Sequence, residues 1–233
     1  MYRRTAEVPA CKTRARHLLT LLLVCASSAH SADQVVEVQD EPRHHVVFEN
    51  PFIRILEVDI APGDISLFHR HRRDNIFVVM GDAERATQVL GSDMSPVGPV
   101  KQGDFGLTRV TGDGLVHRVS NPGRTPLRFT DIELLKTTGS STSANATVKP
   151  VSETEYYRVY RIDVAPGQTS PAMTLGPGVH VYVAGAQLRQ IGADGREAGI
   201  ETAPHAWQWH EAGAYRLRNA GSVNAELIEI ELK

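Results

Sequence analysis

The stretch FIRILEVDIAPGDISLFHRHRRDNIFVVMG, residues 52–81, consists of short apolar runs on either side of a Pro62-Gly63 turn. In residues 55–60, every second side chain is apolar and the side chains between them are acidic. A second run, residues 76–80, is wholly apolar and ends at Gly81. Because side chains alternate across a β-strand, we interpret the first run as a strand with one buried face and the second as a strand buried on both.

The same stretch returns later in the chain. Residues 52–81 align without a gap on residues 156–185. The matched residues are Arg54 with Arg158, Ala61-Pro62-Gly63 with Ala165-Pro166-Gly167, Ser66 with Ser170, Asn121 with Asn219, and Ile132-Glu133-Leu134 with Ile230-Glu231-Leu232. Residues 226–232 alternate in the same way as 55–60, which predicts one buried face. Two copies of a unit of short strands and tight turns predict an all-β chain of two sandwiches or barrels.

The first 31 residues have the composition of a secretory signal peptide. Five basic residues precede an apolar run at 18–26, and small residues follow it. That run is about half the length that a membrane-spanning helix needs. We therefore predict a signal peptide at 1–31 and a secreted or periplasmic protein.

The remaining chain divides at a polar segment that is rich in serine and threonine. We predict a first domain at 32–136, a linker at 137–150 and a second domain at 151–233. Both cysteines, Cys11 and Cys25, lie in the leader, so the mature chain would contain no disulfide. The whole chain carries a net charge of −2, and residues 1–31 carry five basic groups and one acidic group. A mature chain near −6 argues against nucleic acid or an anionic membrane as a partner.

Three histidines give the first copy a candidate metal site. His69 and His71 are two residues apart, so a strand would point both to one face. His117 comes from a distant segment. Three imidazoles on one face can hold one divalent ion and leave coordination positions open for water, oxygen or substrate.

These residues carry a resemblance to a known family. Gly63-x5-His69-x-His71-x3-Asn75-x5-Gly81 resembles the first cupin motif, and Gly106-x5-Gly112-x-Gly114-x2-His117-x3-Asn121 resembles the second in its spacing. The resemblance covers both copies, so the chain looks like a bicupin. It implies two tandem double-stranded β-helix (jelly-roll) barrels, a metal inside the mouth of the first, a small-molecule substrate and a possible homodimer.

The sequence departs from the family pattern at Asn75, where a glutamate often completes the metal shell, and at Gly112, where a proline is usual. With neutral ligands only, the site keeps a charge near +2 and favours an anionic substrate. Asn75 could then orient substrate or a bound water. Asp74 could supply the missing carboxylate only if a bulge changed its direction. Fe(II) is the favoured ion, with Mn, Ni, Co, Cu or Zn as alternatives.

The second copy lacks the histidine pattern. The gapless alignment places Met173 at His69, Leu175 at His71 and Val179 at Asn75, and the later match of Asn121 with Asn219 places Tyr215 at His117. We therefore expect one metal ion per chain. His180, His205 and His210 remain in this copy, but their spacing does not repeat the motif, and we expect no separate site there. His44 and His45 precede the first strong strand and are interpreted as surface residues.

Three functions follow from an open three-histidine site. The first is a metal-dependent dioxygenase acting on a small enolisable or phenolic molecule. The second is an isomerase or lyase that uses the same ion as a Lewis acid and needs no oxygen. The third is a non-catalytic periplasmic protein that binds a small ligand or a metal.

Overall fold

The computed structural model describes residues 34–138, 147–185, 187–199 and 206–233. The predicted signal peptide lies outside these residues, and the predicted linker at 137–150 lies partly outside them. These described residues form one compact unit. The described chain is built of strands, with a single 3-10 turn at Val38–Asp40 and no α-helix among the described residues. The predicted all-β fold is confirmed.

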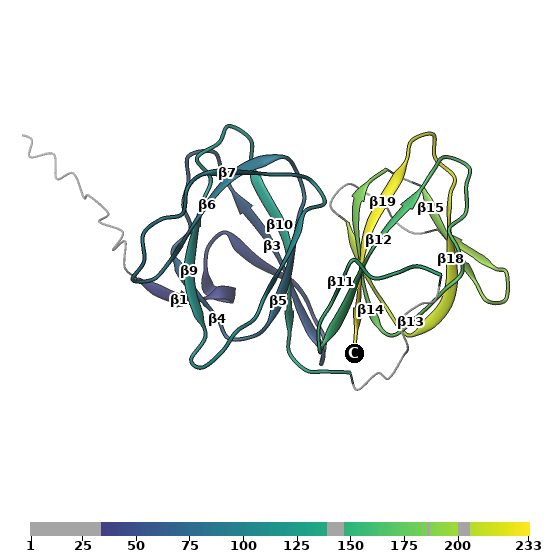
Figure 1. The fold of residues 1–233 in the computed structure, drawn as a ribbon, viewed down its shortest axis with the longest axis horizontal. Helices are drawn as coiled ribbons and strands as arrows, with labels where there is room; N and C mark the ends of the chain where they lie inside the picture. Colours follow the sequence, from purple (N-terminus) through teal and green to yellow (C-terminus); the bar gives the residue numbers. More distant parts are fainter. Residues whose placement is uncertain (1–33, 139–146, 186, 200–205) are drawn as a thin grey trace, which may run out of the picture. The chain divides into compact units, whose positions relative to one another are not determined.

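The first half of the described chain folds into two five-stranded sheets that face each other (Figure 1). One sheet has the order β1-β4-β9-β6-β7 and the other β2-β3-β10-β5-β8. The strands are β1 Val35–Glu37, β2 His44–Glu49, β3 Ile53–Ile60, β4 Phe68–His71, β5 Asn75–Val79, β6 Ala83–Val89, β7 Gly98–Val100, β8 Phe105–Thr108, β9 Leu115–Ser120 and β10 Leu127–Leu134. We call this half the first barrel.

The second half repeats the arrangement. One sheet has the order β11-β12-β19-β14-β17 and the other β13-β18-β15-β16. The strands are β11 Ser152–Glu153, β12 Tyr157–Val164, β13 Met173–Leu175, β14 Gly178–Ala184, β15 Leu188–Gly192, β16 Glu197–Gly199, β17 Trp207–His210, β18 Gly213–Asn219 and β19 Ala225–Leu232. We call this half the second barrel.

The matched residues of the two copies make the same hydrogen bonds to the backbone. The Ser66 hydroxyl accepts a hydrogen bond from the Val119 N–H, and the Ser170 hydroxyl accepts one from the Leu217 N–H. The Asn121 amide donates to two backbone carbonyls beside a turn, and the Asn219 amide does the same. These repeated residues therefore hold the barrel frame, which both copies need.

The alternating strand at 226–232 is buried on both faces, so the prediction of one buried face is wrong. Its apolar side chains join a cluster that also contains apolar residues of the first barrel, such as Ile76 and Val78. Its acidic side chains, Glu229 and Glu231, are fully buried as well. Both faces of strand β10 are buried in the same way. Ile132 joins the shared apolar cluster, and its acidic neighbours in the chain, Asp131 and Glu133, are buried on the other face. In both strands the polar face therefore turns toward the inside of its own barrel.

The strand register corrects one position of the alignment. In the first barrel Asn75 pairs with Glu133, and in the second barrel Gly178 pairs with Glu231. Gly178, and not Val179, therefore occupies the position of Asn75. The connection between β13 and β14 is one residue shorter than that between β4 and β5, and a shift of one residue exchanges the two faces of a strand. His180 consequently takes the position of Phe77.

Within the described residues, no helix is both long and apolar enough to cross a membrane. The domain boundaries at 136 and 151 stay predictions, although β10 ends before the first and β11 begins after the second.

Candidate metal centre

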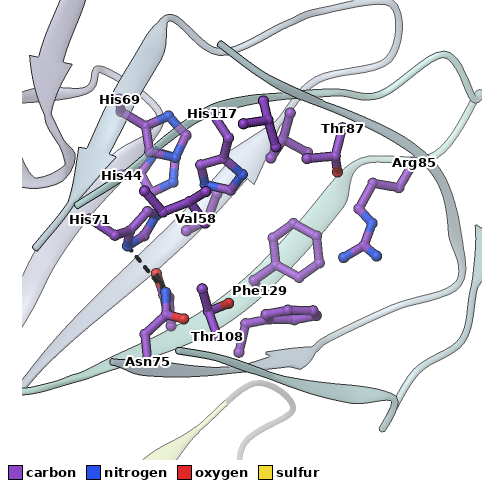
Figure 2. A pocket seen from close by; sticks show the side chains of 15 residues that line it. His44, Val58, His69, His71, Asn75, Arg85, Thr87, Thr108, His117 and Phe129 are labelled. Atoms are coloured by element: carbon purple, nitrogen blue, oxygen red, sulfur yellow. Dashed lines mark hydrogen bonds between the residues drawn. The ribbon is translucent and has the colours of Figure 1, made fainter. Parts of the chain in front are cut away.

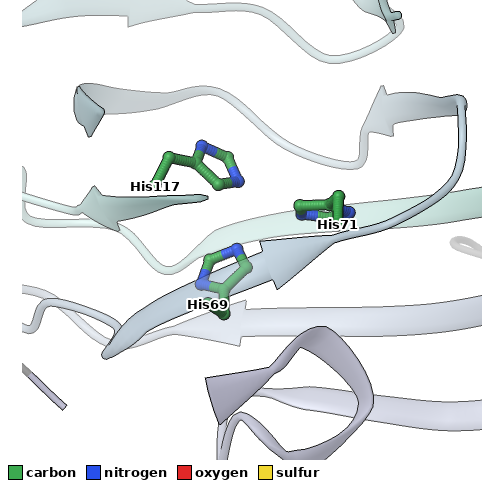
Figure 3. A group of neighbouring side chains, drawn as sticks. All are labelled: His69, His71 and His117. Carbon is green, nitrogen blue, oxygen red and sulfur yellow. The ribbon is translucent and has the colours of Figure 1, made fainter. Parts of the chain in front are cut away.

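The structure brings the three predicted histidines together. His69 and His71 lie on β4, and His117 lies on the neighbouring β9, where it pairs directly with His69. The ring centroids are 4.5 Å apart for His69 and His117, and 5.1 Å apart for each of the other two pairs. One ring nitrogen of each lies within 4.8 Å of the other two. Figure 3 shows the three rings turned toward one common space.

Hydrogen bonding leaves the inner nitrogens available. His69 Nδ1 lies 3.0 Å from the Leu67 carbonyl oxygen, to which it donates, so the lone pair remains on Nε2. The Nε2 atoms of His69 and His117 are buried and have no hydrogen-bond partner among the described residues. Buried polar atoms are rarely left without a partner. The three histidines therefore fit a divalent ion, although that they bind one stays a prediction.

Burial keeps two of the imidazoles in the form that binds metal. Burial and the neighbouring histidines lower the pKa of His69 far below its usual value, and burial lowers that of His117 to about 3. Burial also acts to lower the pKa of His71, but the nearby carboxyl groups of Glu133 and Asp131 raise it overall. Neutral imidazole is the ligand form, so His69 and His117 need no deprotonation near neutral pH.

A polar group stands behind His71. The Asn75 amide nitrogen lies 3.1 Å from His71 Nδ1 and donates to Asp131 Oδ2 at 3.2 Å. Glu133 Oε1 lies 3.7 Å from His71 Nδ1. Burial raises the pKa of Asp131 to about 6, and its Oδ1 has no hydrogen bond in the described chain. Asn75 thus contacts both the candidate ligand His71 and the carboxyl group of Asp131, whose pKa is raised. That Asn75 orients a substrate or a bound water stays a prediction.

The histidines open into a cavity of about 310 Å³. Its other lining residues are His44, Val58, Asn75, Phe77, Arg85, Thr87, Val89, Thr108, Leu115, Val119, Phe129 and Asp131. Figure 2 shows the histidines on one side and Arg85 across the cavity from them. The Arg85 guanidinium lies 5.2 Å from the centroid of the Phe77 ring, and burial lowers its pKa. The cavity thus combines apolar walls, an imidazole cluster and a cationic end.

His44 was interpreted as a surface residue, and that interpretation is wrong. Its side chain is buried, its ring centroid lies 4.4 Å from that of His69, and its Nδ1 lies 2.6 Å from Glu41 Oε2. The motif spacing could not predict that His44 lies at the site, because only the folded arrangement of the strands brings β2 beside it. His45, its neighbour in the chain, is exposed as expected.

Asp74 does not replace the glutamate that the motif lacks. Its carboxylate accepts a hydrogen bond from the Val110 N–H and lies near Arg109, outside the residues that line the cavity. The acidic groups that do reach the site, Asp131 and Glu133, come from β10. Their alternation with apolar residues resembles that of a solvent-facing strand, so the pattern did not identify them as functional residues.

In the second barrel the equivalent positions hold no histidine. Met173 pairs with Tyr215 as His69 pairs with His117. The side chains of Met173, Tyr215 and His69 are buried, and that of His117 is partly buried. Leu175 takes the position of His71. His205 lies outside the described residues. His180 and His210 are both buried, in a different sheet from Met173 and Tyr215.

No family model matches the chain, and no curated protein matches it. Solved structures do. AerE from Microcystis aeruginosa is 14% identical with a TM-score of 0.57, over 83% of this chain and 98% of that one. Salicylate 1,2-dioxygenase from Pseudoaminobacter salicylatoxidans is 11% identical with a TM-score of 0.52, over 78% and 71%.

A third similar structure is an oxalate decarboxylase, which is 12% identical with a TM-score of 0.51 over 86% of this chain and 79% of that one. At such identities the likeness concerns the fold. The oxalate decarboxylase and the salicylate dioxygenase are cupin proteins. Together with the two pairs of facing sheets, these similarities show that the chain has the cupin fold, in two tandem barrels.

Proposed function

We propose that His69, His71 and His117 hold one divalent metal ion, with Fe(II) favoured, and that the first barrel is a dioxygenase of a small anionic molecule. The observation that carries this proposal is the pair of buried Nε2 atoms, on His69 and His117, that converge without hydrogen-bond partners. A bound ion would attract the anionic oxygen of an enolisable or phenolic substrate and, if redox-active, support its reaction with oxygen.

The rest of the cavity suits such a substrate. Phe77 and Phe129 present aromatic surface to a flat molecule. Arg85 lies across the cavity from the histidines and is partly buried, so a carboxylate or a second oxyanion of the substrate would find a charge-assisted hydrogen bond there. We therefore propose a substrate with one anionic oxygen at the histidines and a second polar group at Arg85.

Asp131 is the residue that we assign to proton transfer. Its carboxyl group lines the cavity, and burial raises its pKa to about 6. A base whose pKa lies near the working pH can both accept and return a proton. Asp131 would accept the enol or phenol proton, and Asn75, which donates to Asp131 Oδ2, would hold that carboxylate in place.

The same carboxyl group gives weight to the second candidate, an isomerase or lyase. Proton transfer through Asp131, with the ion as a Lewis acid, needs no oxygen. Turnover under strictly anaerobic conditions would support this candidate and exclude the dioxygenase.

The test uses the full mature chain, loaded with Fe(II) and screened for oxygen uptake with phenols and diketones. We expect oxygen consumption in proportion to substrate, loss of turnover on chelation, and loss in His69→Ala. His45→Ala, which alters an exposed histidine outside the site, is the matched control and should retain full turnover. Unchanged turnover in metal-free protein or in His69→Ala would exclude the proposal. Tight binding of a ligand without conversion would favour the non-catalytic alternative.

We further propose that the protein is exported and acts as a mature chain that begins near residue 32. Cell fractionation and N-terminal sequencing of the recovered protein test this directly. Recovery of the intact chain from the cytoplasm would contradict it. A homodimer stays a prediction, to be checked by the mass of the mature protein in solution.

A further inference from the structure

A second group of metal-ligand side chains lies inside the second barrel. His180 on β14, His210 at the end of β17 and Glu229 on β19 belong to three neighbouring strands of one sheet. His180 pairs directly with Glu229, and His210 pairs with Gly178, two residues before His180. The fold therefore brings together three residues whose spacing in the sequence gives no metal motif.

The ligand atoms of this group lie close together. Both His180 Nε2 and His210 Nε2 lie 2.8 Å from an oxygen of Glu229, each from a different one. The two imidazoles are stacked with their centroids 4.5 Å apart. The Tyr215 hydroxyl, from the opposite sheet, lies 2.6 Å from His180 Nε2 and adds a fourth donor beside the same space.

Two observations point to a cation between these atoms. Glu229 Oε2 is buried without a hydrogen bond among the described residues, although His180 Nε2 is near. His210 Nδ1 lies 3.1 Å from the Glu211 carbonyl oxygen, to which it donates, so a neutral His210 directs its Nε2 lone pair at Glu229 Oε1. Lone pairs that face one another in a buried space are repulsive unless a proton or a metal ion lies between them.

Gly178 provides the room for this group. A Cβ at Gly178 would lie 2.9 Å from Glu229 Oε1 and 3.0 Å from His210 Nε2, as well as 2.3 Å from the Ile230 carbonyl oxygen. Asn75 occupies the equivalent position of the first barrel. The absence of a side chain at Gly178 therefore leaves the space in which the three ligand side chains meet.

The group is closed to solvent. His180 and Glu229 have no exposed surface, and His210 is 8% exposed. Two imidazoles and a carboxylate are a donor set that zinc accepts, and enclosed sites typically hold structural rather than catalytic ions. We propose that His180, His210 and Glu229, with the Tyr215 hydroxyl nearby, form a second, structural binding site for a zinc-type divalent cation. The chain would then hold two ions, in unlike sites, and not the one that the sequence predicts.

The test separates the two barrels. A His69→Ala/His117→Ala variant of the mature chain leaves the first site with a single histidine. We strip it of metal, reload it with Co(II), dialyse it and measure cobalt per chain together with the visible absorption of the bound ion. The expected result is one slowly exchanging Co(II) per chain with the strong absorption of four-coordinate cobalt. Because the first site is already removed, this result does not depend on the proposed dioxygenase.

Glu229→Gln in that background removes the anionic ligand with almost no change of volume, and affinity for Co(II) should fall at least 100-fold. His45→Ala in the same background is the control and should retain the ion. Thermal unfolding gives a second measurement, since added metal should raise the melting temperature of the double variant but not of the variant that also carries Glu229→Gln. The proposal is overturned if the double variant binds no cobalt and its melting temperature is the same with metal and with chelator. The group would then be an ion-paired cluster.

Discussion

The two barrels share a frame but place the imidazoles of their candidate metal sites on opposite sheets. In the first barrel the imidazoles of the proposed site extend from β4 and β9 into an open cavity. In the second, β13 and β18 carry Met173, Leu175 and Tyr215, and the buried imidazoles stand on β14 and β17. What the copies share, such as Ser66 and Ser170, maintains the fold; what differs determines where a ligand can enter.

The acidic residues at one equivalent position show how far the surroundings differ. Asp131 pairs across its sheet with Phe77, whereas Glu229 pairs with His180. Burial raises the pKa of Asp131 to about 6. Burial also acts to raise the pKa of Glu229, but the neighbouring imidazoles of His210 and His180 lower it to about 2. The first barrel therefore keeps a carboxyl group able to exchange a proton, and the second keeps a fixed anion.

The comparison is tested most strongly at His69 and Met173, which occupy the same position. We expect His69→Ala to lower metal-dependent turnover at least 100-fold, because a ligand is lost. Met173 is 1% exposed, and Met173→Ala should cost about 2–5 kcal/mol of the free energy of unfolding while the first site keeps its metal. Metal content and urea unfolding of both variants provide the measurement. Loss of metal from the first site in Met173→Ala would show that the two barrels are not independent in function.

A second prediction concerns Asp131 in metal-free protein. Its pKa in the folded chain, about 6, exceeds the usual value near 3.8, so its contribution to stability is full below about pH 4 and is lost as the pH rises toward 6. Asp131→Asn removes this dependence. The unfolding free energy of the variant relative to the native chain should therefore rise by up to about 3 kcal/mol between pH 4 and pH 7. A difference that does not change with pH would mean that Asp131 is not the titrating group.

A third prediction exchanges one residue between the barrels. By register, Leu188 occupies the position of Arg85. Arg85→Leu should raise the KM for an anionic substrate about tenfold or more, since a hydrogen bond to a charged group contributes about 1.5–3 kcal/mol. Arg85→Lys, which keeps the charge, should recover part of the loss. Steady-state kinetics with the anionic substrate and a neutral analogue check this, and an equal effect on both substrates would exclude the proposed contact.

The smallest effects should appear where the copies agree. Ser66→Ala and Ser170→Ala each leave one buried backbone N–H without its partner, and each should cost about 1–3 kcal/mol. The two losses should be equal within error, and neither should alter the metal content. Urea unfolding of the single variants measures them. A much larger loss from one serine would show that the barrels differ in their frame as well as in their sites.

The sequence predicted the fold and the three histidines because both depend on local patterns. Strand alternation, the Ala-Pro-Gly turns and the repeat predicted two all-β units, and the His69-x-His71 spacing places two rings on one face of β4. The surroundings of the site depend on tertiary placement instead. His44 reaches His69 only through the pairing of β2 with β3. Asp131 is buried because its face of β10 turns toward the inside of the first barrel, while the opposite, apolar face packs against residues of the second.

The second group was missed for a more specific reason. A gapless alignment assigns Val179 to the position that Gly178 holds, so it turns His180 away from the barrel interior. Alternation of Ile228, Glu229 and Ile230 likewise suggested that the glutamate faces solvent, although both faces of β19 are buried. Neither error could be corrected without the strand register.

The shorter connection before β14 has a consequence for engineering of repeated folds. Removal of one residue from a turn rotates the whole following strand by half a period, so every side chain on it exchanges its surroundings at once. No point substitution has this effect. An insertion of one residue between Leu175 and Gly178 would thus be expected to direct Val179 and Val181 inward and His180 toward the apolar layer between the barrels. The length of a turn can therefore decide which chemistry a duplicated barrel is able to acquire.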